Sequence, residues 1–562
     1  MSGGFFMQRI SLNGSWQFRF EQDRLLEDVE NANFEANDIM CVPGAFDTMP
    51  DYFAKRGTAL YRRTFVLEKD VENAFILIDG MGLRCKFRVD GKEAGYSCMP
   101  WSYLEFETGP LSAGLHTITA AVDNNFHSEK MKLFNPDYDF YAFGGFWHGI
   151  ELKLQYEKCE LDRMLIRTLD YRTGKIGVEF LFKGGAPEYF TADIAFDYGK
   201  FEQVEVRNCK SEFTVPDFKL WSPESPALHF ITARVNGTAV TERFGIRTIE
   251  TAKKKILLNG KEIYLKGFNR HESHAESGAA TPETVMIEDL QNMRTLHCNF
   301  VRGAHYPQSR RFLDLCDEFG IMVWEEGIGW GIQESQLADP EFIELQKQQV
   351  ALMVRNSFNH PSIIIWAFLN EHNSGTEAGK NITSELVKVI KAEDSSRLVT
   401  FACSRNSTDI SNDDTDLIAF NTYPYWIDYA APDDNMGRQI LENQEKVLEY
   451  YRTRYGEDKP IIVTEMGCCG VYGHHDRGAA QWTEEFQAEY LENVIKTVFS
   501  SDEICGITLW QLTDCKSFSR SGCILRVKPF AQNLAGVYDG CRRPKLSAAT
   551  VEKLFDPANG SR

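Results

Sequence analysis

Two glutamates, each at the end of a predicted buried strand, are the residues of this chain best suited to do chemistry. Glu371 follows Asn370 and the apolar run 362–368, and Glu465 ends the run 461–465. Both runs are short, follow a proline and are rich in β-branched residues, which is typical of strands buried on both faces of a parallel sheet. Two carboxylates at strand ends suit acid-assisted hydrolysis of a glycosidic bond. A solvated strand end explains either glutamate alone, but it explains both together poorly.

Asn370 adds to this hypothesis because it stands directly before Glu371. An amide at this point can hydrogen-bond the sugar 2-hydroxyl, a contact that strengthens in the oxocarbenium-like transition state. The alternative role is a simple strand-end cap. The neighbouring glutamate favours the functional interpretation.

From residue 251 onward, short apolar strands alternate with amphipathic helical segments. Helical periodicity is clear at 285–297, 340–356 and 483–499. Eight such strands predict a (β/α)8 barrel, whose C-terminal strand ends carry the chemistry. The expected strands are 263–268, 299–303, 321–326, 362–368, 398–402, 416–423, 461–465 and 506–512.

The first 250 residues have the alternating pattern and frequent turn residues of all-β sandwiches. A second, smaller sandwich is expected to follow the first, with 244–250 as its last strand. Met7 is a second candidate start, which would make residues 1–6 an extension. The predicted domains are therefore a β domain at 1–155, a β-sandwich at 156–250 and a catalytic barrel at 251–562.

Composition and charge exclude several partners. Of the 562 residues, 43% are hydrophobic and 25% charged, which is ordinary for a globular protein of several domains. The net charge of −20 opposes binding to nucleic acid or to an anionic membrane surface. The start has no basic segment followed by an apolar one, and no run of about 18 apolar residues exists, so we expect neither a signal peptide nor a membrane span.

The cysteines indicate a reducing compartment rather than a metal site. Fourteen are scattered along the chain, mostly in apolar runs, which without a signal peptide predicts cytoplasmic thiols. The pairs Cys468-Cys469 and His474-His475 lack the spacing of metal ligands, so we interpret them as loop or wall residues. We therefore expect a cytoplasmic protein with no metal and no cofactor.

Nine segments give the chain a specific resemblance to glycoside hydrolase family 2 over almost its whole length. They are LNGSWQF (12–18), VPGAF (42–46), YRRTF (61–65), FGIRTIE (244–250), LKGFNRHE (265–272), RGAHYP (302–307), NHPSIIIWAFLNEH (359–372), TEMG (464–467) and LWQLTD (509–514). The chain resembles most the short, three-domain β-glucuronidase branch. The resemblance implies a jelly-roll-like domain, an immunoglobulin-like domain and a catalytic (β/α)8 barrel.

The resemblance also implies roles for residues. Glu371 would be the acid/base and Glu465 the nucleophile of a retaining exo-glycosidase, whose carboxyl groups lie about 5–5.5 Å apart. The substrate-binding residues implied by position are Asp139 from the first domain, His271, His305, Asn370, Tyr423, Trp510, Arg526 and Asn533. Tyr423 would steady the nucleophile, and Trp510 would form an apolar wall. The histidines would position the substrate.

One departure from the family pattern bears on the substrate. Glucuronidases of this branch carry an Asn-x-Lys pair that binds the sugar carboxylate, whereas this chain has Asn533 followed by Ala535. Arg526 is retained and Lys528 is close in sequence, so the site could still bind an acid through a guanidinium fork. We expect a homo-oligomeric hydrolase of terminal β-hexuronides, galacturonides or glucuronides. A β-galactosidase or other neutral-sugar enzyme is the main alternative, and a non-catalytic carbohydrate-binding protein is the remote one.

Overall fold

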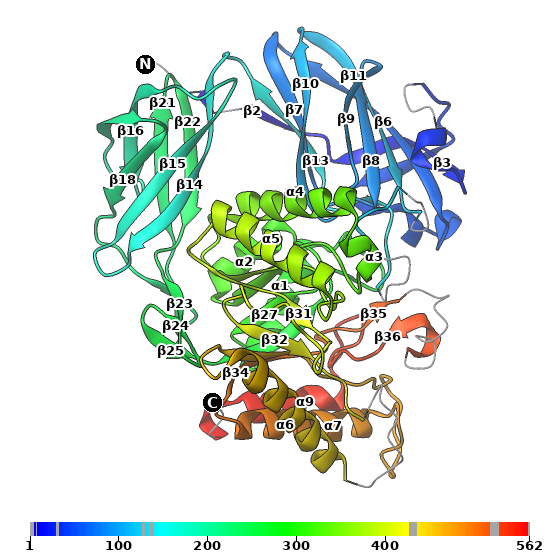
Figure 1. The fold of residues 1–562 in the computed structure, drawn as a ribbon. Coiled ribbons are helices and arrows are strands. Elements are labelled where there is room, and N and C mark those ends of the chain that lie inside the picture. Colours follow the sequence, from blue (N-terminus) through cyan, green and yellow to red (C-terminus); the bar gives the residue numbers. More distant parts are fainter. Residues whose placement is uncertain are drawn as a thin grey trace.

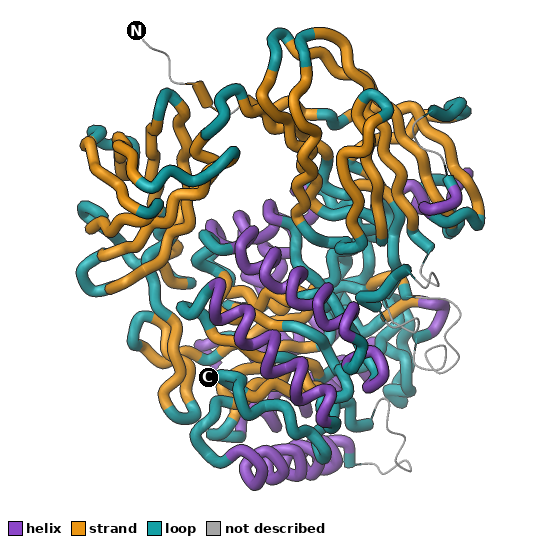
Figure 2. The backbone as a smooth tube through the Cα atoms, turned by 45° about the horizontal axis from the view of Figure 1, so that its top comes forward, coloured by secondary structure: helices purple, strands orange, loops and turns teal. Residues whose placement is uncertain are grey.

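The computed structural model describes residues 5–6, 8–29, 33–125, 130–134, 140–425, 435–517 and 528–559. Two strand-rich units lie beside each other above a unit in which helices surround strands (Figure 1). Figure 2 shows the same division, with orange strands in the upper units and purple helices in the lower one. The fold is two β-sandwiches and a (β/α)8 barrel, which confirms the expected fold class.

The first sandwich packs a four-stranded antiparallel sheet, β10-β7-β13-β2, against a six-stranded one, β4-β3-β6-β11-β8-β9. Alternation along β6 shows why: Tyr61 and Phe65 enter the core, whereas Thr64 and Val66 face solvent. The strands are β2 Gln8–Ser11, β3 Gly14–Gln22, β4 Asp38–Val42, β5 Gly44–Ala45, β6 Gly57–Leu67, β7 Val71–Asp79, β8 Arg84–Val89, β9 Lys92–Ser97, β10 Tyr103–Leu111, β11 Gly114–Asp123, β12 Gly145–Phe146 and β13 Ile150–Gln155; short 3-10 helices are η1 Leu26–Asp28, η2 Phe46–Thr48 and η3 Pro50–Tyr52.

The second sandwich is one sheet of order β1-β22-β21-β16-β17-β18-β15-β14. Its strands β14 and β22 are not paired but lie against each other, so the sheet wraps around a core of its own. The strands are β1 Phe5–Phe6, β14 Glu160–Asp170, β15 Lys175–Lys183, β16 Tyr189–Phe196, β17 Glu202–Arg207, β18 Lys210–Thr214, β21 His229–Val235 and β22 Thr238–Phe244, with β19 Trp221–Ser222 and β20 Ser225–Pro226 as a separate pair. Strand β1 joins this sheet although the residues after it build the first sandwich.

A three-stranded meander leads into the barrel and closes its N-terminal end. It consists of β23 Ile249–Ala252, β24 Lys255–Leu258 and β25 Lys261–Ile263. Its apolar side chains share a buried cluster with Leu265, Phe300 and Met322, which begin or nearly begin barrel strands. The expected single strand 244–250 is therefore divided: β22 ends at Phe244, and β23 begins a new sheet.

All eight expected barrel strands are present, in parallel order around a closed sheet. They are β26 Leu265–Arg270, β27 Phe300–Gly303, β28 Met322–Glu326, β29 Ile363–Ala367, β30 Leu398–Thr400 continued by β31 Ala402–Cys403, β32 Ile418–Asn421, β33 Ile461–Glu465 and β34 Ile504–Leu509. The fifth strand is split at Phe401, so that β30 pairs with β29 and β31 pairs with β32. This split strand completes the ring.

Helices follow most barrel strands and pack their apolar faces onto the sheet, and the three helical segments expected from periodicity are confirmed. The helices are α1 Glu283–Thr295, α2 Arg310–Phe319, α3 Glu334–Leu337, α4 Pro340–Ser357, α5 Glu377–Glu393, α6 Met436–Tyr455, α7 Glu484–Ser500 and α9 Leu546–Phe555, with 3-10 turns η4 Pro529–Ala531 and η5 Pro557–Asn559. The short strands β35 Cys515–Lys516 and β36 Gln532–Asn533 form a hairpin after β34. Between β31 and β32, the described residues 404–417 contain no helix.

The first sandwich docks on the C-terminal rim of the barrel through an apolar cluster. Trp101, Phe140 and Trp147 of the sandwich share it with Tyr306 and Ile328 of the barrel. The rings of Trp101 and Tyr306 are stacked, with centroids 4.3 Å apart. Among the described helices, none has the length and apolar character needed to cross a membrane.

Candidate active site

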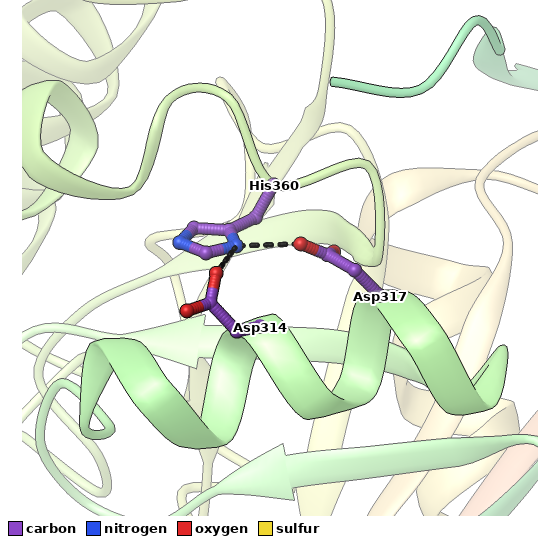
Figure 3. Close-up of side chains that lie close together, drawn as sticks. All are labelled: Asp314, Asp317 and His360. Atoms are coloured by element: carbon purple, nitrogen blue, oxygen red, sulfur yellow. Dashed lines mark hydrogen bonds and ion pairs between the residues drawn. The ribbon is translucent and has the colours of Figure 1, made fainter. Parts of the chain in front are cut away.

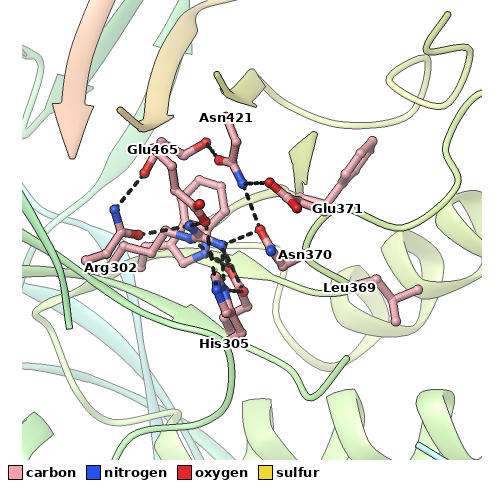
Figure 4. Close-up of polar contacts among 12 residues, drawn as sticks. Arg302, His305, Leu369, Asn370, Glu371, Asn421 and Glu465 are labelled. Carbon is pink, nitrogen blue, oxygen red and sulfur yellow. Dashed lines mark hydrogen bonds and ion pairs between the residues drawn. The ribbon is translucent and has the colours of Figure 1, made fainter. Parts of the chain in front are cut away.

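The C-terminal ends of the barrel strands bring buried polar side chains into one network (Figure 4). The carboxyl ends of parallel strands meet at one rim, so residues far apart in sequence become neighbours there. The network contains Asn269, Arg302, Glu326, Asn370, Asn421 and Glu465, which stand at or just after the ends of β26, β27, β28, β29, β32 and β33.

Glu465 is held through both of its carboxylate oxygens. Oε1 accepts a hydrogen bond from Arg302 Nη1 at 2.6 Å, and Oε2 accepts one from the Tyr423 hydroxyl. Burial raises the pKa of Glu465 to about 8; Arg302 opposes this rise and the nearby charge of Glu371 adds to it. Glu371 is therefore close enough to influence the Glu465 carboxyl group electrostatically. Arg302 and Tyr423 favour the anion at Glu465.

Glu371 lies across the network from Glu465, on a locally strained backbone (Figure 4). Leu369 and Glu371 have φ angles of 47° and 55°, in the left-handed region that is unfavourable for residues other than glycine. The Glu371 N–H donates to the Ala402 carbonyl at 2.9 Å, which ties this turn to the fifth strand. Asn421 Nδ2 donates to Glu371 Oε1 at 2.9 Å. Such strain, stabilised by its surroundings, is frequent at functional sites.

Asn370 accepts two hydrogen bonds on its side-chain oxygen. They come from Arg302 Nη2 at 2.8 Å and from Asn421 Nδ2 at 3.1 Å. Its Nδ2 is buried and has no hydrogen-bond partner in the described part of the chain. A buried donor without a partner is costly, so this amide group is suited to donate to a bound ligand.

Arg302 connects most of the site through its five N–H donors. Besides Glu465 and Asn370, it donates to both carboxylate oxygens of Glu326, at 2.9 and 3.0 Å, and to Asn269 Oδ1 at 2.9 Å. Burial alone would lower the pKa of Arg302, but Glu326 and Glu465 raise it above its ordinary value. The guanidinium is therefore a permanent positive charge in contact with the carboxylates of Glu326 and Glu465.

Aromatic rings form the wall beside this network. The His305 and Trp510 rings are stacked, with centroids 5.3 Å apart and an interplanar angle of 9°. His271 meets the Trp510 ring edge-on at 5.4 Å, and its Nδ1 lies 3.2 Å from the Tyr306 hydroxyl. Phe140, from the first sandwich, packs 5.3 Å from the His271 ring. The first sandwich therefore contributes directly to the surroundings of the site.

The structure brings most of the sequence-predicted site residues together: Asn370, Glu371, Tyr423, Glu465, His271, His305 and Trp510. Asn533 is buried on β36, where its Oδ1 accepts from the Ala535 N–H at 3.3 Å. Its carbonyl accepts from Gln511 Nε2 at 3.4 Å, which connects it to the residue after Trp510. Asp139 and Arg526 lie outside the described residues.

Sequence reasoning missed Arg302, Glu326, Asn269 and Asn421. Each lies at or near the C-terminal end of an expected strand, as the two predicted glutamates do. A signal was therefore present: a polar residue that ends an apolar strand of a barrel faces the rim.

One cluster of potential metal ligands among the described residues lies on the outside of the barrel (Figure 3). His360 Nδ1 is 2.7 Å from Asp317 and 3.9 Å from Asp314. Arg243 already pairs with both carboxylates, at 2.6 Å to Asp314 and 3.1 Å to Asp317. A cation would have to compete with this guanidinium, so we interpret the cluster as an ion-pair contact between the second sandwich and the barrel.

The vicinal cysteines and histidines do not converge on one another. Cys468 and Cys469 are buried in the loop after β33. His475 has a half-exposed side chain and pairs with Glu485 at 2.8 Å.

Comparison with known proteins gives consistent similarities. The family model for the TIM barrel domain of glycosyl hydrolases family 2 matches residues 249–554. The β-glucuronidase of Sus scrofa is 24% identical over 623 residues, covering 99% of this chain and 92% of that protein. The β-glucuronidase of Mus musculus is 27% identical over 456 residues, covering 78% of this chain and 68% of that protein.

Solved structures are similar over the full length. A GH2 β-galacturonidase from Eisenbergiella tayi bound to galacturonate is 27% identical, with a TM-score of 0.87 and coverage of 99% of each chain. A β-glucuronidase from Faecalibacterium prausnitzii, at 21% identity and a TM-score of 0.84, shares the fold.

Proposed function

Since this chain belongs to glycoside hydrolase family 2 and is a glycoside hydrolase, we propose that it is a retaining, exo-acting enzyme that releases terminal β-linked hexuronic acids. One observation carries the proposal: Glu465, which accepts hydrogen bonds from Arg302 and Tyr423, and Glu371 belong to one side-chain network at the strand-end rim. The two carboxyl groups have the different surroundings that a nucleophile and an acid require.

Glu465 is the proposed nucleophile. Its carboxylate forms a bond to the anomeric carbon as the bond to the leaving oxygen breaks, and Glu371 gives that oxygen a proton. In the second step water attacks the anomeric carbon, Glu371 takes a proton from the water, and Glu465 leaves. The contacts from Arg302 and Tyr423 support this role, because they counteract the rise in pKa that burial causes and so stabilise the ionised form of Glu465 that attacks.

The remaining polar and aromatic groups are suited to bind the sugar. Asn370 Nδ2, which has no partner among the described residues, is the proposed donor to the 2-hydroxyl. The stacked pair of His305 and Trp510, with His271 at its edge, forms an apolar wall for the ring. Asp139 is proposed to accept hydrogen bonds from sugar hydroxyls.

The hexuronide class is supported by the resemblance to a galacturonate-bound β-galacturonidase over 99% of both chains. Asn533 is retained, buried and close to the rim, whereas Ala535 supplies no cation. Loss of one charge-assisted contact to a carboxylate costs about 1.5–3 kcal/mol, roughly 10- to 150-fold in kcat/KM if nothing compensates. Arg526 is the proposed replacement, and Lys528, which is buried in the same stretch, is the second candidate.

A panel of aryl β-glycosides tests the proposal: galacturonide, glucuronide, galactoside, glucoside and mannoside. We expect the highest kcat/KM on a uronide, with galacturonide turned over at least as well as glucuronide. Arg526→Ala should depress uronide hydrolysis more than galactoside hydrolysis. Clear preference for the galactoside would establish the neutral-sugar alternative. Absence of turnover on every member would leave the non-catalytic sugar-binding interpretation.

Mechanism-based labelling tests the assignment of the nucleophile separately. A 2-deoxy-2-fluoro glycosyl fluoride of the preferred sugar should form a stable ester with Glu465, identified by peptide mass spectrometry. An ester on another residue, or a product of inverted configuration, would reject the assignment.

We further propose a cytoplasmic homo-oligomer. The thirteen described cysteines are all free thiols, which suits a reducing compartment. Light scattering on the purified chain measures the assembly state. A monomeric mass would reject the oligomer.

A further inference from the structure

The orientations of two side-chain amides in the site follow from one guanidinium. Arg302 has only hydrogen-bond donors, so the Asn370 atom 2.8 Å from its Nη2 must be the amide oxygen. That same oxygen lies 3.1 Å from Asn421, which must therefore present its nitrogen. The oxygen of Asn421 then faces the Thr464 hydroxyl, which donates to it at 2.8 Å. The orientation of Asn370 therefore determines that of Asn421.

This chain of contacts ends on the proposed acid/base. Asn421 Nδ2 has two hydrogens, and its two acceptors are Asn370 Oδ1 and Glu371 Oε1, the latter at 2.9 Å (Figure 4). Because Oε1 faces a donor, a proton on that oxygen would meet another hydrogen. The proton of a neutral Glu371 is therefore favoured on the other oxygen, Oε2.

We propose that Asn421 is a positioning residue for both groups, which holds Asn370 with its amide nitrogen toward the sugar and confines the transferable proton of Glu371 to Oε2. The inference rests on the proposed function, because it assigns no new reaction. When the leaving oxygen takes the proton, the Oε2–H bond breaks and its electron pair stays on the carboxylate. The donor from Asn421 stabilises the negative charge shared with Oε1. Water later returns a proton to Oε2.

The same chain explains the unpaired nitrogen of Asn370. Two donors, from Arg302 and Asn421, point at Asn370 Oδ1, so a flipped amide would set its N–H groups against both. The buried Nδ2 is thus held ready for a hydroxyl before the substrate arrives. Preorganised donors of this kind need no reorientation in the transition state.

The variants Asn421→Ala and Asn421→Asp test the inference. Asn421→Ala should lower kcat/KM by about 10- to 100-fold on aryl glycosides with poor leaving groups and much less on activated ones. It should also shrink the ratio of kcat/KM between the normal substrate and its 2-deoxy analogue, because Asn370 is then free to flip. Asn421→Asp keeps the size and puts a carboxylate against Glu371, so the alkaline limb of its pH profile should move to higher pH.

Two comparisons separate positioning from general structural support. Thr464→Val, which removes the hydroxyl that orients Asn421, should shift the leaving-group dependence in the same direction by a smaller factor. Asn406→Ala is the matched control: its Nδ2 bonds the main-chain oxygen of Asn421 at 2.8 Å without reaching Asn370 or Glu371. It should leave both the leaving-group dependence and the 2-deoxy ratio unchanged.

The wild type separates failure of the proposed function from failure of this inference. No wild-type turnover, or a fluorosugar ester elsewhere than Glu465, would reject the proposed function itself. With an active wild type labelled on Glu465, equal losses across leaving groups in Asn421→Ala and Asn406→Ala would overturn the positioning role. Azide should not rescue Asn421→Ala, because its acid/base carboxylate is still present, and rescue would likewise overturn it.

Discussion

At the scale of single residues, the site separates two chemically identical carboxyl groups by their contacts. Glu465 accepts hydrogen bonds from a buried guanidinium and a phenol, whereas Glu371 Oε1 accepts one from the neutral Asn421 amide. Arg302 and Tyr423 stabilise an anion at Glu465 against the effect of its burial, whereas the Asn421 amide adds no charge beside Glu371. This asymmetry is what a retaining mechanism needs from two carboxyl groups of similar intrinsic pKa.

Removal of the acid/base should lower kcat/KM more for substrates with poor leaving groups than for those with good ones. Glu371→Ala is expected to reduce kcat/KM by about 10²- to 10⁴-fold on a poor leaving group, because protonation is lost, and far less on a dinitrophenyl glycoside. Azide should restore turnover and give a β-glycosyl azide, since a small anion attacks without a general base. Rates on both substrates and the configuration of the azide product check this. Uniform losses without rescue would contradict the role.

The raised pKa of Glu465 predicts a pH-dependent stability effect. Its pKa rises from 4.5 to about 8 on folding, so between these values the folded state binds more protons than the unfolded state. Stability conferred by this group is therefore present at low pH and is lost as the pH rises toward 8. Glu465→Gln removes the titration, so its melting temperature relative to wild type should increase from pH 5 to pH 8.

Thermal unfolding in matched buffers measures that difference. Glu489→Gln makes the same chemical substitution at an exposed position on α7 and should show a flat difference across the range. A flat difference for Glu465→Gln as well would show that burial does not raise the pKa of this carboxyl group. The same variant should lose at least about 10³-fold in turnover, because an amide cannot serve as the nucleophile.

The sequence predicted the glutamates better than the residues around them. Glu371 and Glu465 are visible because each follows a run of apolar residues that can only be a buried strand. Arg302 occupies an equivalent position, but an arginine at a strand end is common on any surface. Its burial depends on Glu326 and Glu465, which come from two other strands. Contacts between residues of different strands cannot be predicted from the residues that neighbour Arg302 in the sequence.

At the scale of elements, the barrel strands place the site through close backbone contacts at their ends. The Trp510 N–H donates to the Met466 carbonyl at 3.0 Å, which joins the end of β34 to the loop after β33. Gly467 follows at this crossing, and a Cβ there would lie 1.9 Å from the Trp510 carbonyl oxygen. Only glycine permits this approach of the nucleophile's loop to the aromatic wall.

Gly467→Ala is therefore expected to push the ends of β33 and β34 apart. We expect a lower melting temperature and a large loss of kcat/KM, because Glu465 and Trp510 would both shift. Gly177→Ala is the matched control, since its added methyl group would lie 3.5 Å from Leu169 in the second sandwich. If the barrel variant kept wild-type kinetics, the close approach would have no part in positioning the site.

The ends of individual strands show what the local sequence pattern could not predict. The eight barrel strands were predictable because buried parallel strands are continuous apolar runs. The split of the fifth strand at Phe401 was not, because residues 398–402 contain no glycine or proline that would mark a break. The stretch 244–250 likewise alternates like one strand, and only the pairing of Ile249 with Leu258 shows that a new sheet begins there.

At the scale of the whole molecule, the first sandwich supports the barrel site. Trp101 stacks on Tyr306, and the Tyr306 hydroxyl lies 3.2 Å from His271 Nδ1 and accepts from the Glu272 N–H at 3.1 Å. Phe140 of the sandwich also packs on His271, with ring centroids 5.3 Å apart. The resemblance implied that the first domain reaches the site through Asp139, but the aromatic cluster that joins the two units was not expected, because aromatic residues in a β domain are ordinarily core residues.

Trp101→Leu should consequently impair catalysis from outside the barrel. Trp101 is buried in the docking cluster; truncation of such a side chain to alanine costs about 3–5 kcal/mol, and the leucine variant should lose part of this. We expect a lower melting temperature. At temperatures well below melting we also expect a reduced kcat/KM, because Tyr306 loses its stacking partner and no longer holds His271 beside Trp510.

Trp16→Leu is the matched control, since Trp16 is fully buried in the sandwich core and is not part of the docking cluster. That variant should lose stability while keeping kcat/KM in the folded protein. Equal kcat/KM in the two variants would mean that the sandwich docks on the barrel without shaping its site.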